Sequence, residues 1–186
     1  MSLMRLLFVG IPGAGKSTQA KLLVPYGFRH ISTGELIRES WKREDELTMP
    51  YKDRIESGGF LPDREIFLLI EKEIASLKDE RGYVLDGAVR NITQTETALK
   101  MGLIGKVLRF YLSEEKAAER LIKRLEMQGR KDDSLKVIKR RIKTYKRFTA
   151  PIIPNMERKK VPIISLDASL SVGEIHYGIL EILKLK

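Results

Sequence analysis

Short apolar runs alternate with longer amphipathic stretches along most of this chain. Five of the runs are rich in residues that favour strands, and they occupy 6–9, 29–31, 83–86, 107–111 and 161–166. The stretches between them carry apolar residues at helical spacing. Alternating strands and helices indicate a parallel sheet covered by helices. The sequence therefore predicts an α/β fold, a five-stranded parallel sheet with helices on both faces, in one domain spanning 1–186.

Polar residues indicate where several of the helices begin. Capping-box spacing occurs in Ser32 with Glu35, in Ser171 with Glu174 and, more loosely, in Asn91 with Gln94. A further helix is expected after Ser134, with a buried stripe of Leu135, Ile138, Ile142, Tyr145 and Phe148. Pro151 and Pro154 are expected to kink or end it. The segments 32–61 and 124–133 do not fit the sheet-and-helix pattern, and each carries charge where a lid over a phosphate site would need it.

The composition limits the classes of partner. The chain has 35 Lys and Arg against 25 Asp and Glu, and this net charge of +10 is compatible with nucleic acid or polyphosphate. It has no cysteine, which excludes disulfides and thiolate metal sites, and His30 and His176 lack a partner at metal-ligand spacing. No apolar stretch approaches the roughly 18 residues of a membrane span, and no signal-peptide pattern is present. A cytoplasmic protein without a membrane partner is therefore expected.

A glycine-rich loop follows the first apolar run. Residues 10–18 read G-I-P-G-A-G-K-S-T, which is the P-loop pattern G-x-x-x-x-G-K-[ST] between a strand and a helix. Glycine lets backbone N–H groups approach a polyphosphate closely, and Lys16 adds a positive charge for the β- and γ-phosphates. The loop predicts a P-loop NTPase fold that binds a nucleoside triphosphate through Gly13, Ala14, Gly15, Lys16, Ser17 and Thr18.

An acidic residue ends the third apolar run. Asp86 is expected at the carboxyl end of its strand, where a parallel sheet presents ligand-binding groups. Together with a hydroxyl of Ser17 or Thr18 it can hold Mg²⁺, largely through water. The guanine-reading pattern N-K-x-D does not occur in the chain, which disfavours a GTPase.

Five ordered motifs make the chain resemble the adenylate kinase family of nucleoside monophosphate kinases. The family pattern G-x-P-G-x-G-K-G-T-Q occurs at 10–19 with Ser17 in place of a glycine, and S-T-G-x-x-x-R occurs at 32–38. The pattern D-G-F-P-R-x-x-x-Q occurs at 86–94, with Ala88-Val89 in place of Phe-Pro. The pattern R-x-x-x-R is supplied by Arg120 and Arg124, and the last motif comprises Arg130, Asp132, Asp133, Arg141, Tyr145, Thr149 and Pro151.

The resemblance implies an Mg²⁺-dependent transfer of the terminal phosphoryl group from ATP to AMP, giving two ADP, without zinc. It implies catalytic roles for Lys16, Arg90, Arg124, Arg130 and Arg141, and ATP contacts that include Arg120, Arg124 and Leu170. AMP would be bound by Thr33, Gly34, Arg38, Gly59, Phe60, Leu61, Gly87, Arg90, Gln94, Arg130 and Arg141. It also implies a mobile monophosphate-binding segment at 32–61, a short lid at 124–133 and a monomer. No catalytic base is needed, because the acceptor is an ionised phosphate oxygen.

Only a few residues indicate which nucleobase the acceptor nucleotide carries. Gln94 matches the adenine-reading glutamine of the family, although it could instead complete the helix cap with Asn91, and Thr33 also favours AMP. The departures Ala88-Val89 and Asp63-Arg64-Glu65 leave a UMP/CMP kinase or a relaxed monophosphate kinase open. A P-loop kinase for a small metabolite would not require both Arg38 and Arg90. A non-catalytic, RNA-associated protein is disfavoured, because no aromatic-rich RNA motif occurs.

Overall fold

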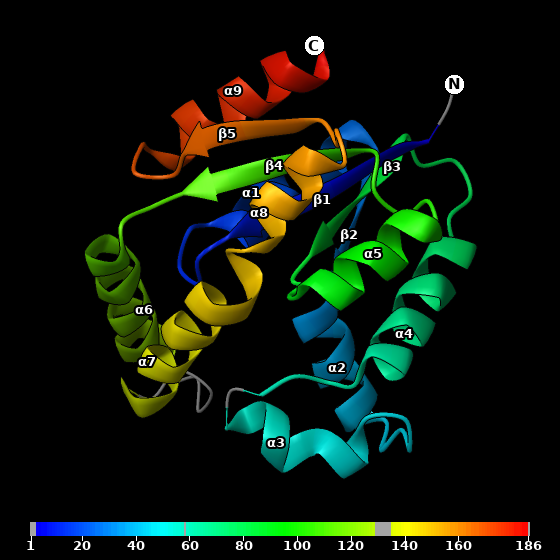
Figure 1. The fold of residues 1–186 in the computed structure, drawn as a ribbon, viewed down its shortest axis with the longest axis vertical. Helices are drawn as coiled ribbons and strands as arrows, with labels where there is room; N and C mark the ends of the chain where they lie inside the picture. The colour runs from blue at the N-terminus through cyan, green and yellow to red at the C-terminus, as the bar shows by residue number, and fades with distance from the viewer. Residues whose placement is uncertain (1–2, 58, 129–134, 186) are drawn as a thin grey trace.

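A single parallel sheet organises the protein. The computed structural model describes residues 3–57, 59–128 and 135–185 (Figure 1). Within these residues the sheet has five parallel strands in the order β2-β3-β1-β4-β5. The strands are β1 (Met4–Gly10), β2 (Phe28–Ser32), β3 (Gly82–Asp86), β4 (Lys106–Tyr111) and β5 (Ile163–Asp167). Each predicted strand is present, and no boundary differs from the prediction by more than two residues.

Helices fill the connections between the strands. The α-helices are α1 (Lys16–Leu22), α2 (Thr33–Lys42), α3 (Lys52–Glu56), α4 (Asp63–Ala75), α5 (Ile92–Lys100), α6 (Glu114–Gln128), α7 (Leu135–Thr144), α8 (Ile152–Arg158) and α9 (Val172–Leu183). Short 3₁₀-helices occur at η1 (Val24–Tyr26) and η2 (Met49–Tyr51), and a π-helix, η4 (Tyr145–Thr149), continues α7. In the described part of the chain, no helix is long and apolar enough to cross a bilayer.

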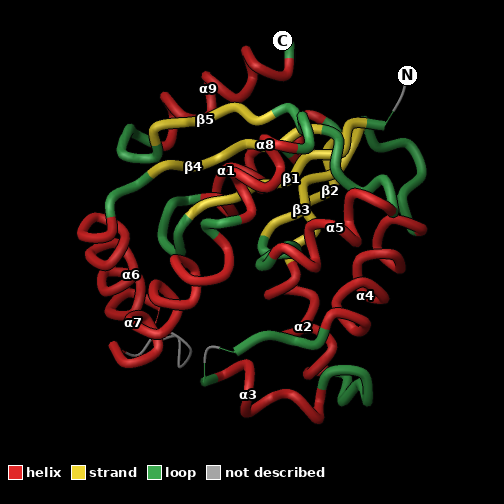
Figure 2. Tube along the Cα trace, in the orientation of Figure 1, coloured by secondary structure: helices red, strands yellow, loops and turns green. Residues whose placement is uncertain are grey.

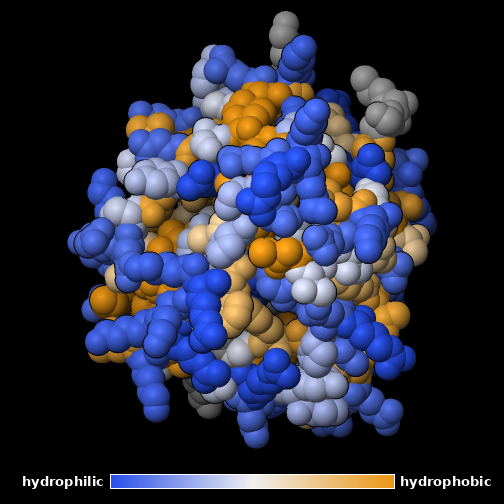
Figure 3. Space-filling model, in the orientation of Figure 1, coloured by the Kyte–Doolittle hydropathy of each residue, from blue (hydrophilic) through white to orange (hydrophobic). Residues whose placement is uncertain are grey.

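The central strand β1 sends alternate side chains into two separate cores. Leu6 and Phe8 pack in a core that includes apolar residues of α1 and α9. Leu7 and Val9 pack in a second core with residues of α4, α5 and α8. Because successive side chains of a strand point to opposite faces, both faces of the sheet are covered. The predicted α/β architecture, with helices on both faces, is confirmed. The face drawn in Figure 3 is mainly hydrophilic, with smaller hydrophobic groups between.

The predicted stripe of the helix after Ser134 is only partly correct. Ile138 and Ile142 are buried, but Leu135 is 57% exposed and Phe148 is 42% exposed. Leu135 is the first residue of α7, at the end remote from the sheet (Figure 1). Phe148 lies in η4, where the wider π turn rotates each residue by less than an α-helix does. Consequently Thr149, not Phe148, faces inward.

Candidate active site

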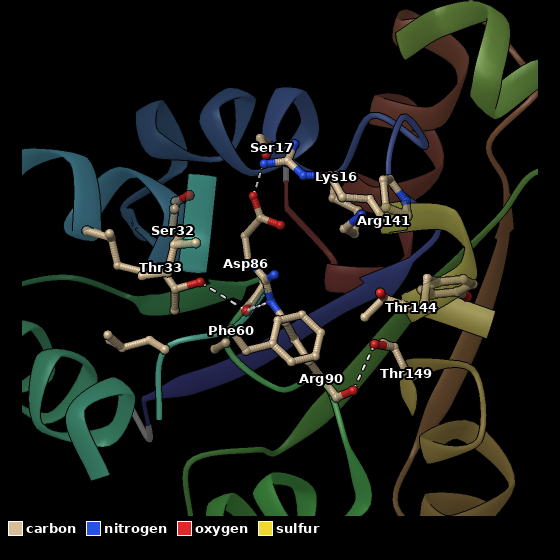
Figure 4. A pocket seen from close by; sticks show the side chains of 18 of the residues that line it. Lys16, Ser17, Ser32, Thr33, Phe60, Asp86, Arg90, Arg141, Thr144 and Thr149 are labelled. Carbon is tan, nitrogen blue, oxygen red and sulfur yellow. Dashed lines mark hydrogen bonds between the residues drawn. The ribbon is translucent and has the colours of Figure 1, made fainter. Parts of the chain in front are cut away.

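The carboxyl ends of β1, β2 and β3 open into a cavity of about 750 Å³ (Figure 4). The P-loop, α2, the segment 59–66, α6 and α7 complete its wall. Predicted site residues that line it are Gly13, Gly15, Lys16, Ser17, Thr18, Thr33, Gly34, Arg38, Gly59, Phe60, Leu61, Asp86, Gly87, Arg90, Gln94, Arg120, Arg124 and Arg141. Two predicted residues, Ala14 and Leu170, do not line it, and Arg130 lies outside the described residues. Sequence motifs far apart in the chain therefore meet in one cavity.

The glycine loop has the backbone that a phosphate cradle requires. Gly13 and Gly15 have φ values of 92° and 82°, which side-chain-bearing residues rarely adopt. A Cβ atom at Gly10 would lie 2.6 Å from the carbonyl oxygen of Phe110, so the strand end admits only glycine. Buried Ala14 closes the turn, since its N–H donates to the Ile11 carbonyl at 3.1 Å.

Lys16 lies within the curve of this loop. Its Nζ donates to the carbonyl oxygens of Gly10 at 2.8 Å and Ile11 at 3.1 Å. Burial lowers the pKa of Lys16 below its ordinary value, although the charge of Asp86 acts in the opposite direction. An ammonium group that donates its hydrogen bonds to neutral carbonyls is well placed to exchange them for hydrogen bonds to an anion.

Asp86 is buried at the end of β3, and its carboxylate has several donors. Ser17 Oγ donates a hydrogen bond to Oδ2 (Figure 4). His30 Nε2 lies 3.3 Å from the same oxygen. Burial alone would raise the pKa of Asp86, but His30, Lys16 and Ser17 together hold it below its ordinary value. The group is therefore an anionic oxygen donor beside a hydroxyl, which is the chemistry Mg²⁺ prefers. No cluster of three or more metal-ligating side chains was found among the described residues.

Arg90 and the carbonyl that holds it have several neighbours in the cavity wall. Its Nε donates to the carbonyl oxygen of Gly87 at 2.8 Å, and Thr33 Oγ1 donates to the same oxygen at 2.9 Å. The ring of Phe60 lies 5.0 Å from the guanidinium carbon (Figure 4). Burial, and then the charge of Arg141, lower the pKa of Arg90 to about 10. Arg90 is consequently still a cation at neutral pH.

The other predicted arginines approach the cavity from different elements. Arg38 extends from α2 and is exposed, while Arg124 of α6 and Arg141 of α7 line the opposite wall. Arg120 Nη1 donates to the carbonyl oxygen of Ala168 at 2.8 Å, which ties α6 to the loop that contains Leu170. Leu170 itself is 45% exposed. Such a concentration of guanidinium groups with Lys16 favours a polyanionic ligand.

Gln94 is buried next to Arg90 and does not complete the helix cap as the sequence allowed. Asn91 Oδ1 accepts from the Gln94 backbone N–H at 2.8 Å, which forms one half of a capping box. The Gln94 side chain instead accepts from the backbone N–H of Arg90 at 2.8 Å and donates to Asp63 Oδ1 at 2.7 Å. At Ser171 and Glu174, by contrast, both halves of the predicted capping box are present.

Sequence reasoning missed several residues of the cavity wall. Trp41, Lys42 and Thr144 line it, and so does Tyr145, which the sequence placed in the last motif and in a buried stripe but not in the site. Helical spacing could have found them, because residues three and four positions apart share a helix face. Trp41 and Lys42 follow Arg38 by this spacing, and Thr144 and Tyr145 follow Arg141 in the same way.

Known proteins are similar in sequence to this chain over most of its length. A model of the family described as adenylate kinase matches residues 8–161. An adenylate kinase of Porphyromonas gingivalis is 38% identical over 165 residues, covering 86% of this chain and 85% of that protein. Adenylate kinase 1 of a Nostoc species is 35% identical over 171 residues, with 89% and 91% covered. An adenylate kinase of Prochlorococcus marinus is 35% identical over 183 residues, with 96% and 98% covered. With this agreement added to the phosphate cradle and the arginine-lined cavity, the chain belongs to the adenylate kinase family.

Proposed function

We propose that this chain transfers the terminal phosphoryl group of ATP to AMP, giving two ADP, in the cavity at the carboxyl edge of the sheet. The activity is that of a phosphotransferase whose acceptor is itself a phosphate group. One observation carries the assignment: a P-loop lysine and a separate set of arginines line the same cavity. Two phosphate chains that meet end to end need positive charge on both sides of the transferred group.

The donor nucleotide would occupy the P-loop side. Gly13, Gly15 and the following residues Lys16, Ser17 and Thr18 present backbone N–H groups, an ammonium group and hydroxyls to its phosphates. Ala14 would support this cradle from beneath, as its buried position and its bond to Ile11 favour. Arg120 and the loop with Leu170 would hold the nucleoside end.

Mg²⁺ would be held by Ser17, Thr18 and Asp86, largely through water. The buried carboxylate, its lowered pKa and the adjoining Ser17 hydroxyl all suit a hard cation with oxygen ligands. When bound, the ion would neutralise charge on the β- and γ-phosphates of ATP.

The acceptor would bind on the opposite side, with its phosphate between Arg38 and Arg90. Thr33, Gly34, Gly59, Phe60, Leu61 and Gly87 would surround the nucleoside, and Gln94 would contact the base. The attacking phosphate oxygen is already ionised, so the protein has to align it and to stabilise developing charge. Arg124 and Arg141 are placed for that second task, and Arg130, outside the described residues, is assigned the same role from the sequence alone.

Water must be excluded so that ATP is not hydrolysed. The segment 32–61 is a candidate for this closure, because α2 and α3 project below the sheet while α6 and α7 lie to its left (Figure 2). The predicted lid, 124–133, is described only as far as 128, where it completes α6. We further propose a cytoplasmic monomer. Its partners would be free nucleotides and not nucleic acid, because the motif arginines within the described residues line the cavity.

A panel of acceptors tests the proposal. Purified protein is incubated with ATP, Mg²⁺ and one of AMP, UMP, CMP, GMP or dAMP, and ADP formation is measured. AMP is expected to react fastest. Faster reaction of UMP or CMP would replace AMP by a pyrimidine acceptor, and no reaction with any monophosphate would refute the proposed function.

A further inference from the structure

The side-chain amide of Gln94 is held at both ends by groups that permit only one orientation. Its Oε1 accepts from the backbone N–H of Arg90 at 2.8 Å, and a backbone N–H can only donate. Its Nε2 donates to Asp63 Oδ1 at 2.7 Å, and a carboxylate can only accept. Gln94 is 2% exposed, so water does not substitute easily for either partner.

Reversing this amide would be costly. The rotated side chain would bring Oε1 against the Asp63 carboxylate and the NH₂ group against the N–H of Arg90. One contact would then place two acceptors together and the other would place two donors together. The Asp63 carboxylate and the Arg90 N–H would each lose a hydrogen bond in a part-buried position. Either neighbour alone opposes reversal, but only Asp63 does so with a charge.

Fixing the amide fixes what Gln94 presents to the cavity. After its two internal bonds, one Nε2 hydrogen and one Oε1 lone pair remain, and Gln94 lines the cavity whereas Asp63 does not. A purine with a 6-amino group offers an acceptor at N1 beside a donor at N6. A 6-oxo purine offers the reverse, a donor at N1 beside an acceptor at O6. A glutamine that could turn freely would match either edge, but a locked one matches a single edge.

We propose that Asp63 is a positioning residue that locks the Gln94 amide and thereby makes the acceptor site select 6-amino over 6-oxo purine monophosphates. This inference rests on the proposed function, in which Gln94 contacts the acceptor base. Asp63 is well anchored for the task, because it begins α4 directly after Pro62, whose ring restricts the backbone.

The test compares AMP with IMP, since these acceptors differ only at N1 and the 6-position. Asp63→Asn and Asp63→Ser replace the carboxylate by groups that can donate or accept. Glu65→Gln is the matched control, because it removes the other acidic charge from the first turn of α4. For each protein, kcat/KM for AMP and for IMP is measured at saturating ATP and Mg²⁺, together with the KM for ATP, the Tm and the affinity for each monophosphate.

Both Asp63 variants are expected to reduce the AMP-to-IMP ratio of kcat/KM by about tenfold, the scale of the net contribution of one hydrogen bond, because the Gln94 amide loses one of its two fixed partners. The Glu65→Gln variant should keep the wild-type AMP-to-IMP ratio. The KM for ATP should be the wild-type value in all three variants. Each ratio is taken within one variant, so partial unfolding does not alter it. An unchanged ratio in both variants, with wild-type protein active on AMP, would overturn the role of Asp63. Wild-type protein inactive on AMP would instead overturn the proposed function.

Discussion

The hydroxyl of Thr149 donates a hydrogen bond to the backbone carbonyl of Arg90 at 2.8 Å (Figure 4). Thr149 ends the π-helix that continues α7, and α7 carries Arg141 on the other wall of the cavity. The bond thus joins the arginine of the acceptor site to the helix that faces it. Thr149 is buried, so the bond is protected from competing water.

Replacing Thr149 by valine keeps the shape of the side chain but removes this donor. We expect the KM for AMP to rise by about fivefold, which corresponds to the loss of one buried hydrogen bond. The KM for ATP should not change, and Thr149→Ser should restore the wild-type value. Thr97→Val, which removes a hydroxyl from the α5 surface, is the control. An equal rise in both KM values would indicate a general loss of structure instead.

Removing the guanidinium of Arg90 should disable the acceptor site alone. Arg90→Ala is expected to lower turnover of AMP by at least about 100-fold, because a pre-oriented cation at the transferred phosphate is lost. ATP affinity, measured by calorimetry without AMP, should stay nearly unchanged. Arg64→Ala removes an exposed arginine of α4 that does not line the cavity, and it should behave as the wild type. Retention of most activity by Arg90→Ala would show that the acceptor phosphate binds elsewhere.

The Ser17 hydroxyl is the one that bonds to Asp86, so it is the better candidate for supporting Mg²⁺. Ser17→Ala should raise the Mg²⁺ concentration needed for half-maximal activity by about fivefold, with little effect on the KM for AMP. Thr18→Val is measured beside it, because Thr18 also lines the cavity and is exposed. A larger shift in Thr18→Val would transfer the assignment to Thr18.

Local sequence was sufficient for the sheet and the phosphate cradle. The strand before Gly10 is apolar on both faces, which is typical of a central strand of a parallel sheet. The glycine spacing of the P-loop predicts the backbone conformation of the loop. Motif residues at strand ends, such as Asp86, were placed correctly because parallel strands end at one edge. The side-chain roles around Gln94 were not predictable in this way. Its partner Asp63 lies 31 positions away, and only packing of α4 against the β3–α5 connection brings the two together.

The π-helix could not be predicted from local sequence either. An apolar stripe read at α-helical spacing carries no sign of a wider turn, so Phe148 was expected inside. Thr149 was present in the sequence motif, yet its bond to Arg90 spans 59 positions and forms only because the fold brings η4 beside the β3–α5 connection. Local pattern therefore defined which residues matter, while tertiary contacts defined how they are held.

A final prediction concerns stability at high pH. Tyr83 in β3 is 1% exposed, and its hydroxyl donates to the carbonyl oxygen of Leu103 at 2.9 Å. Burial raises the pKa of Tyr83 from 10.0 to about 12. The phenol therefore ionises in the unfolded chain at a lower pH than in the folded protein. Stability is unaffected below pH 10, and it is lost as the pH rises from 10 towards 12, because only the unfolded state then releases the proton.

Tyr83→Phe separates the hydrogen bond from this titration. Near pH 8 the wild type should exceed the variant in free energy of unfolding by roughly 1 kcal/mol, the net contribution of one hydrogen bond. The advantage should shrink above pH 10 and disappear near pH 11, where ionisation of the unfolded chain costs the wild type about the same amount. Urea denaturation of both proteins from pH 8 to 11 measures the difference, and other titrating groups cancel because the two chains share them. A difference that stays constant over this range would mean that Tyr83 ionises equally in both states, in which case its burial does not control its charge.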